Sequence, residues 1–387
     1  MALFEYADVA IVGGGAVGCA TAYYLSQAGL RVVIVEREAL GSGASAHATG
    51  SFDTLAHDVT PGPYLTLLNR GAQMVKELAP ALAGETGIDL YFQLRPGLRV
   101  ALNEEEAAYL RSRVAEAGDG RQFISGQEAH QLEPRLSPAV VGAALVDEVI
   151  QLDSYRLTLA YAHAAERRGA RVLLREVVGL ERMGSEVTGL HLSTGRLPCN
   201  RVVLAMGVWN GVAQSWLDFP IPVRPLKGQS LRLQYAGEPL SFIMGGTRWG
   251  HLLSRRDGLV SCGSTEEEVD FDAHPTEEGR WQVLNLALSL MPCLEEAQVV
   301  QHLAGFRPLS ADNLPLLGTV PGWEGVYLAT GHGRRGIHLS AISGKLLADL
   351  IIHGTTELPL EPFLPARFAG ITQRAPPQPP PDTPAFQ

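Results

Sequence analysis

The sequence predicts an α/β protein with two parts: one domain built on a parallel sheet and a second, α+β domain built on an antiparallel sheet. Residues 8–36 follow the order strand, glycine-rich turn, helix and strand, which is typical of a βαβ unit. Residues 231–269 contain successive short apolar runs separated by turn residues, which is typical of antiparallel strands. Residues 326–351 again pass from a strand through a glycine-rich turn into a long helix.

The composition excludes several classes of function. The chain has 387 residues, enough for two or three domains, and its formal charge of −10 argues against a nucleic-acid partner. No apolar run approaches the roughly 18 residues of a membrane span, and the N-terminus lacks the basic region of a signal peptide, so we expect a cytoplasmic protein with no membrane span. The four cysteines form no CxxC pair, so the sequence predicts neither a metal site nor a disulfide framework.

The first element is a buried strand at residues 9–12 that ends in Gly13-x-Gly15-x-x-Gly18. In a dinucleotide-binding turn the first glycine allows the tight turn, the second leaves room for a pyrophosphate, and the third lets the helix pack closely on the strand. The following helix runs to about Gly29, and its first residues, Ala16 and Val17, direct unpaired N–H groups toward the phosphates.

The second strand, residues 30–36, ends at Glu36, whose carboxylate can accept hydrogen bonds from both ribose hydroxyls of an adenosine. Residues 41–51 are small and flexible and come directly after this acid, so we expect a ligand-binding loop, with a plain linker as the alternative. The cofactor contacts predicted in this stretch are Arg37, Ala44, Ser45, Thr49, Gly50 and Ser51.

Further elements follow in order along the chain. The pattern predicts helices at 64–83, 104–117, 156–168 and 276–291, a pair of strands at 91–102 turning at Pro96-Gly97, a strand at 171–174, a hairpin reaching Leu192, and short strands at 201–205 and 326–329. Within residues 231–269 a hairpin turns at Asp257-Gly258.

These elements suggest a discontinuous division into domains. Residues 1–85, 148–222 and 300–366 form the expected cofactor-binding domain, and residues 86–147 and 223–299 form the expected substrate-binding domain. Residues 367–387 are dense in proline and are expected to be a disordered tail.

The spread of candidate cofactor contacts favours FAD over a nicotinamide. Beyond the first βαβ unit, contacts are predicted at Val177, Gly207, Trp209, His332, Gly333, Arg334, Arg335, Gly336 and Ile337. A cofactor contacted along so much of the chain is large, extended and retained. A nicotinamide dehydrogenase is the alternative, and protein that lacks a flavin spectrum would support it.

Six segments together resemble the D-amino-acid oxidase (DAO) superfamily of FAD-dependent oxidoreductases, and within it the glycine oxidases of thiamine biosynthesis. They are DVAIVGGGAVGCATAYYL, GSGASAHATG, PVRPLKGQSLRL, HLLSRRDGLVSCGSTEEEVDFD, AGFRPLSADNLPLLG and YLATGHGRRGIHLSAISGKLLADLI. The resemblance covers about residues 7–365. It implies a Rossmann-like FAD domain of the glutathione-reductase type, joined to a substrate domain on an antiparallel sheet.

The resemblance also implies which residues bind substrate. Arg307, in AGFRP, matches the arginine that anchors the substrate carboxylate, a task that suits a bidentate guanidinium. Arg334, in GHGRRGI, matches a second position lining the site, although a structural ion pair is the alternative. His251 takes the place of a tyrosine that touches the substrate in glycine oxidase, so side-chain selectivity could differ.

Two further positions bear on the type of enzyme. Val260 stands where monomeric sarcosine oxidase has a lysine for oxygen activation, and residues 306–310 lack that enzyme's flavin-linking cysteine, so this type is disfavoured. His47 falls where dimethylglycine and sarcosine dehydrogenases have a histidine bonded to the flavin, but Ala46 replaces their tryptophan. We therefore expect non-covalent FAD, with a bond through His47 as the alternative.

The resemblance implies oxidative deamination of glycine, sarcosine or a D-amino acid. A hydride would pass from Cα to flavin N5, and the resulting imine would hydrolyse to a 2-oxo acid, with O2 as the expected acceptor and no catalytic acid or base from the protein. One alternative is a dehydrogenase that passes electrons to a quinone or carrier protein, and another is a flavin-binding module without turnover. Self-association is also expected from the resemblance.

Overall fold

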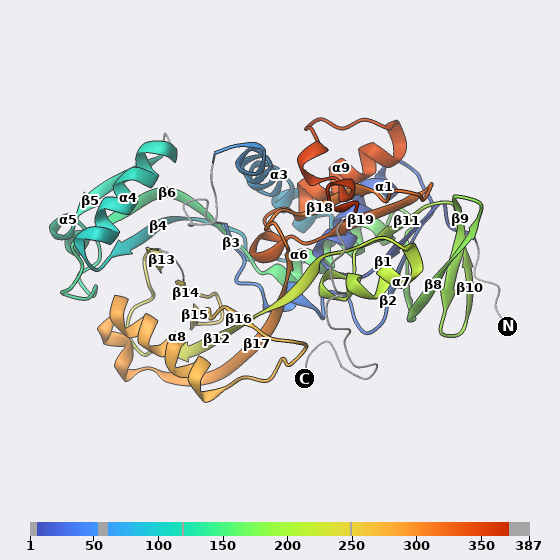
Figure 1. Ribbon diagram of the computed structural model, residues 1–387. Helices are drawn as coiled ribbons and strands as arrows, with labels where there is room; N and C mark the ends of the chain where they lie inside the picture. Colours follow the sequence, from blue (N-terminus) through green and yellow to red (C-terminus); the bar gives the residue numbers. More distant parts are fainter. Residues whose placement is uncertain (1–5, 53–60, 118–119, 248–249, 371–387) are drawn as a thin grey trace.

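The computed structural model describes residues 6–52, 61–117, 120–247 and 250–370. Two large sheets dominate this part of the chain, and a small three-stranded sheet lies beside one of them. Figure 1 shows the six-stranded sheet on the right, and the second sheet with its helices α4, α5 and α8 on the left. This arrangement agrees with the predicted combination of a parallel and an antiparallel sheet.

The six-stranded sheet has the strand order β18-β19-β11-β1-β2-β7. Its strands are β1 (Val9–Val12), β2 (Val32–Glu36), β7 (Arg171–Leu174), β11 (Val202–Leu204), β18 (Leu316–Thr319) and β19 (Val326–Thr330). All neighbours pair in parallel except β18, which is antiparallel to β19. The order therefore reverses beside β1, and such a switch point is where α/β sheets bind ligands.

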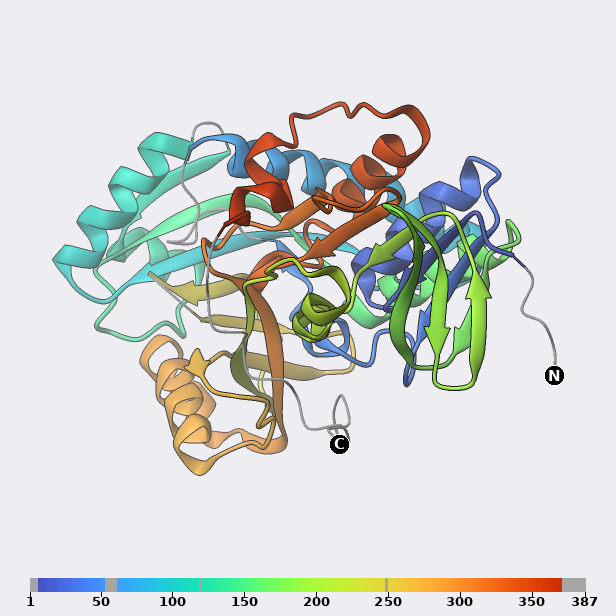
Figure 2. The ribbon, with the colours of Figure 1, turned by 45° about the vertical axis from the view of Figure 1, so that its right-hand side comes forward.

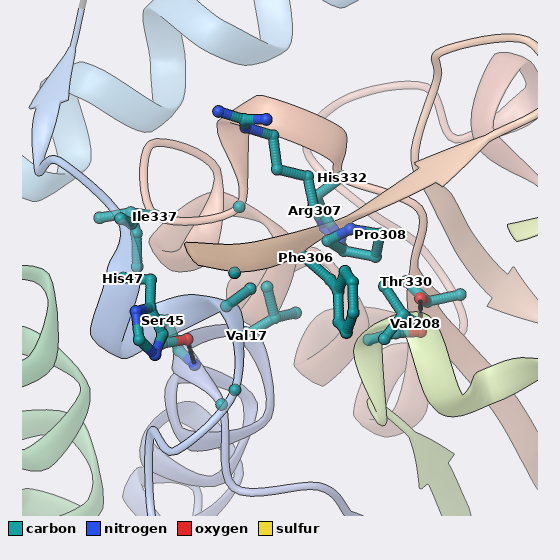
Figure 3. Close-up of a pocket in the computed structure, with 18 of the residues that line it drawn as sticks. Val17, Ser45, His47, Val208, Phe306, Arg307, Pro308, Thr330, His332 and Ile337 are labelled. Carbon is teal, nitrogen blue, oxygen red and sulfur yellow. Dashed lines mark hydrogen bonds between the residues drawn. The ribbon is translucent and has the colours of Figure 1, made fainter. Parts of the chain in front are cut away.

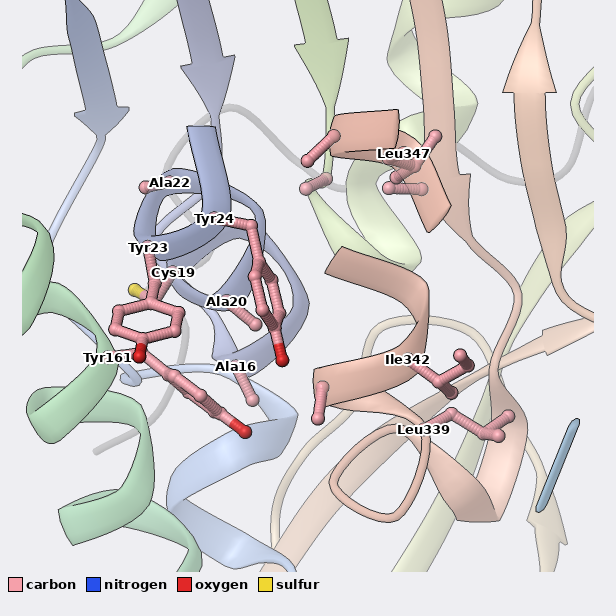
Figure 4. Packing of buried hydrophobic residues seen from close by; sticks show 14 of the residues in the cluster. Ala16, Cys19, Ala20, Ala22, Tyr23, Tyr24, Tyr161, Leu339, Ile342 and Leu347 are labelled. Carbon is pink, nitrogen blue, oxygen red and sulfur yellow. The ribbon is translucent and has the colours of Figure 1, made fainter. Parts of the chain in front are cut away.

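Four helices form the core beside this sheet: α1 (Ala16–Gln27), α3 (Pro63–Thr86), α6 (Ser154–Glu166) and α9 (Ser340–His353). Both α6 and α9 pack against α1, and Figure 4 shows Tyr23 of α1 beside Tyr161 of α6. Small residues let α1 and α9 approach closely, because a Cβ on Gly344 would lie 2.7 Å from the carbonyl carbon of Ala20. This packing fixes the direction of α1, whose N-terminus follows the glycine-rich turn.

The second sheet follows the path β16-β12-β15-β14-β13-β4-β6-β3, with β17 paired to β12 and β5 paired to β6. Its strands are β3 (Ser51–Phe52), β4 (Gln93–Ala101), β5 (Arg121–Ser125), β6 (Gly142–Gln151), β12 (Val223–Gln234), β13 (Ile243–Gly246), β14 (His251–Ser254), β15 (Leu259–Gly263), β16 (Glu267–Glu268) and β17 (Gln298–Ser310). Among the described strands of this sheet, β13 and β4 are the one pair that runs parallel. The helices α4 (Glu104–Ala117) and α8 (Glu277–Leu290) pack on it.

The remaining elements are short. In Figure 2 the strands β8 to β10 stand at the right as a separate three-stranded sheet. The elements are β8 (Val177–Met183), β9 (Glu186–Leu192), β10 (Gly195–Pro198), α2 (Ala44–His47), α5 (Gly126–Leu132), α7 (Gln214–Leu217) and the 3-10 turns η1 (Gly207–Ala213), η2 (Pro292–Glu296), η3 (Gly333–Arg335), η4 (Glu361–Phe363) and η5 (Pro365–Phe368). In the described ranges, no helix has the length and apolar character needed to cross a membrane.

One predicted element is wrong. Residues 91–102 were predicted to be two strands turning at Pro96-Gly97, but β4 continues through this dipeptide. Arg95 pairs with Val149 and Gly97 with Val146 of β6, so Pro96 lies at an irregularity in the ladder. Proline is tolerated at such a bulge because its missing N–H is not needed there.

The predicted domain limits stay predictions. Both β6 and β17 run across a predicted boundary, at 147/148 and 299/300 respectively. At the start of the predicted tail, Phe368 is buried in η5 and Arg367 forms an ion pair with Asp312. The rest of the tail, residues 371–387, lies outside the described residues.

Candidate active site and cofactor cavity

A cavity of about 610 Å³ is lined by residues from both large sheets. It collects segments far apart in the chain, including the turn after β1, the end of β2, the loop around α2, β17 and η3. Figure 3 shows part of this lining. All but one of the predicted cofactor residues line the cavity: Gly13, Gly15, Ala16, Val17, Glu36, Arg37, Ala44, Ser45, Thr49, Gly50, Ser51, Val177, Gly207, Trp209, His332, Gly333, Arg334, Arg335, Gly336 and Ile337.

The exception is Gly18, which lies behind the lining. A Cβ at this position would come within 2.1 Å of the Gly13 carbonyl oxygen, so glycine is needed where α1 packs on the preceding turn. Gly13 has a φ of +109°, and a Cβ there would lie 2.4 Å from the Ala205 carbonyl oxygen. At Gly15, by contrast, a Cβ would meet Ser45 Oγ at an ordinary contact distance of 3.4 Å, so a side chain there would extend beside the cavity.

The first turn of α1 faces this cavity. Its N-cap residue is Gly15, which has no side chain to cap the first N–H groups of the helix. The Ala16 N–H donates to Ser45 Oγ at 3.0 Å, a bond drawn in Figure 3. This contact ties the loop around α2 to the start of α1, where a helix N-terminus favours negatively charged groups.

Glu36 is held by the backbone at the end of β2. Its two carboxylate oxygens accept hydrogen bonds from the N–H groups of Gly14, at 2.7 Å, and Glu38, at 2.9 Å. These two bonds orient the Glu36 carboxylate. Because a carboxylate has about four acceptor positions, it can still accept hydrogen bonds from hydroxyl groups of a ligand in the cavity.

The Trp209 side chain gives a second sign of a ligand on this side of the cavity. Its buried indole N–H has no hydrogen-bond acceptor among the described residues, and buried donors are normally paired. The Arg37 guanidinium lies 5.5 Å from the indole ring centre. The glycine cradle, the oriented acid and this donor fit an extended dinucleotide such as FAD.

Arg307 extends from β17 on the side opposite Phe306, as Figure 3 shows. Its guanidinium donates to the Ser264 hydroxyl and to the carbonyl oxygens of Thr265, at 3.2 Å, and Lys227, at 3.4 Å. It can lie across β12 because residue 228 is glycine, where a Cβ would come within 2.2 Å of Nη2. Burial lowers the pKa of Arg307 to about 10. Because this value is still well above 7, the guanidinium is cationic at neutral pH.

Arg334 also lines the cavity, but its guanidinium has a carboxylate partner. Its Nε and Nη2 both donate to Glu266, and the two side chains are 22% and 34% exposed, respectively. The structural ion pair, which was the alternative to a substrate-binding role for Arg334, is therefore present. It lies at a partly exposed part of the lining.

His251 lies in the lining between Thr49 and Ser261. The Thr49 hydroxyl is 3.3 Å from Nδ1, and the Ser261 hydroxyl is 3.1 Å from Nε2. The buried Arg232 guanidinium donates to the same Ser261 hydroxyl. Burial first, and then the charges of Arg232 and other arginines, lower the pKa of His251 to about 3, so the ring is neutral.

His47 lies on α2 and packs against Gly305 of β17, where a Cβ would be 3.1 Å from the imidazole Cγ. Burial and the charge of Arg232 lower the pKa of His47 to about 4. The ring lines the same cavity as the glycine-rich turn. Whether it is bonded to a flavin stays a prediction.

The sequence prediction missed Arg99, Ser264 and Glu266, which also line the cavity. Ser264 and Glu266 come directly after β15, within a segment that carries the family resemblance, so their position could have signalled them. Arg99 had no such signal, because only the pairing of β4 with β13 brings it to the cavity. The described residues contain no group of three or more histidines, cysteines and acids that could hold a metal ion.

Comparisons with known proteins agree with this site. The family model DAO, described as FAD dependent oxidoreductase, matches residues 8–350. The chain is 31% identical to glycine oxidase of Geobacillus kaustophilus, over 94% of this chain and 97% of the relative. It is 32% identical to glycine oxidase of Pseudomonas aeruginosa, over 92% of this chain and 98% of the relative.

A solved structure of glycine oxidase from Geobacillus kaustophilus superposes with a TM-score of 0.90 at 30% identity, over 95% of this chain and 100% of that one. The parallel sheet, the cavity beside its switch point and these matches lead to one conclusion. The chain belongs to the DAO family of FAD-dependent oxidoreductases.

Proposed function

We propose that this FAD-dependent enzyme oxidises the Cα–N bond of a small amino acid such as glycine, sarcosine or a D-amino acid. The single observation that supports this most is Arg307, a partly buried cation in the cavity lining whose guanidinium donates to neutral oxygens. Such a cation needs an anionic partner, and a substrate carboxylate provides one. The glycine oxidases among the relatives point to the same substrate class.

In the proposed reaction the substrate loses two electrons and two protons, one from Cα and one from nitrogen. FAD, when bound, supplies the two-electron acceptor. The product is an imine, and water adds to it to release a 2-oxo acid and ammonia, or methylamine from sarcosine. Arg307 holds the carboxylate, and His251, neutral at the working pH, forms part of the wall without adding a charge.

The proposed cofactor contacts follow from the lining. Glu36 would accept from the ribose hydroxyls, and the N-terminus of α1 would face the pyrophosphate. The turn η3 and the residues up to Ile337 would form a third segment against the cofactor. Cytoplasmic location and self-association remain predictions from the sequence.

The substrate is tested by an anaerobic screen of glycine, sarcosine, D-alanine and D-proline against the isolated flavoprotein. Loss of flavin absorbance at about 450 nm identifies a reducing substrate. If no amino acid or N-methyl amino acid bleaches the flavin, the proposed function is wrong and a non-catalytic flavin-binding module becomes the better account.

The electron acceptor needs a separate experiment. We propose O2, with a quinone or carrier protein as the alternative. Stoichiometric peroxide under air would support an oxidase. Slow peroxide formation, together with fast turnover on an artificial dye, would support a dehydrogenase.

We also propose that FAD is held without a covalent bond. Precipitation in acid should leave the flavin in the supernatant. Colour that stays with the pellet in the wild type, and moves to the supernatant in His47→Ala, would instead establish a bond through His47.

A further inference from the structure

Three charged side chains form a cluster at one end of the cavity lining: Arg307 of β17, Arg334 of η3 and Glu266, which follows β15. Ser264 accepts a hydrogen bond from Arg307, and two residues later Glu266 accepts two from Arg334. One short segment therefore contacts both arginines. The proposed function uses Arg307 but gives no role to Glu266.

The position of Glu266 is fixed by its neighbours in the chain. On one side, the Thr265 hydroxyl accepts the Gln229 N–H at 2.9 Å, and Thr265 is buried. On the other side, Glu267 accepts from Gln229 Nε2 at 2.8 Å and lies 3.6 Å from the buried Lys227. Because both flanking residues are anchored in the sheet, Glu266 is held toward the cavity side in a defined place.

We infer that Glu266 is a specificity-determining residue that neutralises Arg334 and thereby restricts the site to amino acids with a single carboxylate. This inference rests on the proposed function, because it assumes that Arg307 binds the substrate carboxylate. It defines the substrate class more narrowly: the side chain of the preferred amino acid carries no negative charge.

The charges of these three side chains set the charge of the ligand that fits beside them. With Glu266 ionised, the three side chains together carry a net charge of +1, which matches one carboxylate. A second carboxylate on the ligand would approach Glu266, and like charges at short distance repel. Without the Glu266 charge, the two arginines would carry a net charge of +2, which matches two carboxylates. Arg99 lines another part of the cavity, where its Nη1 donates to backbone carbonyls, and it stays unchanged in this comparison.

The test compares two small ligands on the FAD-loaded protein: acetate, with one carboxylate, and malonate, with two. Binding is followed by the change in flavin absorbance, so the result does not depend on turnover. In Glu266→Gln we expect the malonate affinity to rise relative to acetate by about tenfold, which corresponds to about 1.4 kcal/mol. The matched control is Glu268→Gln, which makes the same charge change at an exposed residue paired with Arg224 outside the lining. We expect it to change the ratio less than twofold.

An unchanged ratio in Glu266→Gln, or an equal change in Glu268→Gln, would overturn the inference. If Glu266→Gln does not fold, Arg334→Gln gives the opposite test. With the Arg334 charge removed and the Glu266 charge kept, malonate binding should weaken more than acetate binding, and equal weakening would overturn the inference. Turnover of D-aspartate and D-alanine distinguishes a failure of the role given to Glu266 from a failure of the proposed function. If D-alanine bleaches the flavin but the D-aspartate to D-alanine ratio does not rise in Glu266→Gln, only the role of Glu266 is wrong. If no amino acid bleaches it while malonate binding rises as expected, the proposed function is wrong, and Glu266 selects ligands by charge without selecting an amino acid substrate.

Discussion

Arg307 has the contacts expected of a side chain that binds an anionic ligand. Its neighbours Ser264, Thr265 and Lys227 supply neutral oxygens that orient the guanidinium without cancelling its charge. A lysine could not reproduce these contacts, because an ammonium group lacks the planar fork of donors. The affinity for a carboxylate should therefore depend on the protonation of this one side chain.

The pH dependence follows from the pKa of Arg307, which burial lowers to about 10. Arg307 is charged below this pH and loses its charge above it, so acetate should bind with constant affinity between pH 6 and 9 and more weakly as the pH approaches 10. Acetate itself stays ionised over this range. Titrations of the flavin absorbance at each pH give the dissociation constants. A steady loss of affinity from pH 6 upward would contradict the assignment.

His251 offers a second test at the residue scale. Replacement by leucine leaves the Ser261 hydroxyl, which accepts from the buried Arg232, without its histidine partner, so His251→Leu should lower kcat/KM about tenfold while FAD stays bound. His251→Gln keeps a polar group that can bond to Ser261 and should recover most of the loss. Equal kcat/KM values for the two variants would show that polarity at this position is unimportant.

Among the elements, the βαβ start could be predicted because its signals are local. A buried strand, Gly13, Gly15 and Gly18 at fixed spacing, and Glu36 after the second strand each act on neighbours a few residues away. The structure brings all of these except Gly18 to the cavity. For the same reason the successive strands and the hairpin at Asp257-Gly258 could be predicted from turn residues.

Elements set by tertiary pairing could not be predicted. Pro96-Gly97 is a strong local turn signal, yet β4 continues because β6 and β13 pair with it on both sides. The same pairing with β13 places Arg99 at the cavity, and no pattern near Arg99 indicates this. Likewise the resemblance identified Arg334, but its ion pair with Glu266 depends on a segment 68 residues away.

The packing of α1 gives a prediction at the element scale. In Gly18→Ala the new Cβ would meet the Gly13 carbonyl oxygen, so the variant should lose about 2 kcal/mol or more of unfolding free energy. The control is Gly84→Ala in α3, where a Cβ meets nothing within 4 Å, and which should be neutral or stabilising by up to about 1 kcal/mol. Denaturant unfolding of both variants measures this. Equal stability would show that α1 can shift without cost.

In the whole molecule, residues of both large sheets line the cavity. Groups that line the ligand site therefore also affect the stability of the fold. Three of the histidines that line the cavity, His47, His251 and His332, are kept neutral by burial. Burial lowers their pKa values to about 4, 3 and 4 respectively, whereas an unfolded histidine titrates at about 6.5. Between these values the unfolded chain binds protons that the folded chain does not.

The sign of the effect is therefore fixed: stability is full above pH 6.5 and falls as the pH drops toward 4. Each histidine should contribute on the order of 2 kcal/mol to the loss between pH 6.5 and 5. Denaturant unfolding at both pH values measures the total. His332→Gln should reduce the loss, whereas His274→Gln, at an exposed position, should not. A pH-independent stability would contradict the burial of these rings.

One experiment tests both FAD binding in this cavity and the anchoring of an amino acid by Arg307. Anaerobic stopped-flow reduction of the wild type and of Arg307→Lys by the best small amino acid tests this most directly. We expect yellow protein in both cases, with a substrate dissociation constant raised about tenfold or more in the variant. Colourless protein that does not take up FAD, or the same dissociation constant in both proteins, would contradict it.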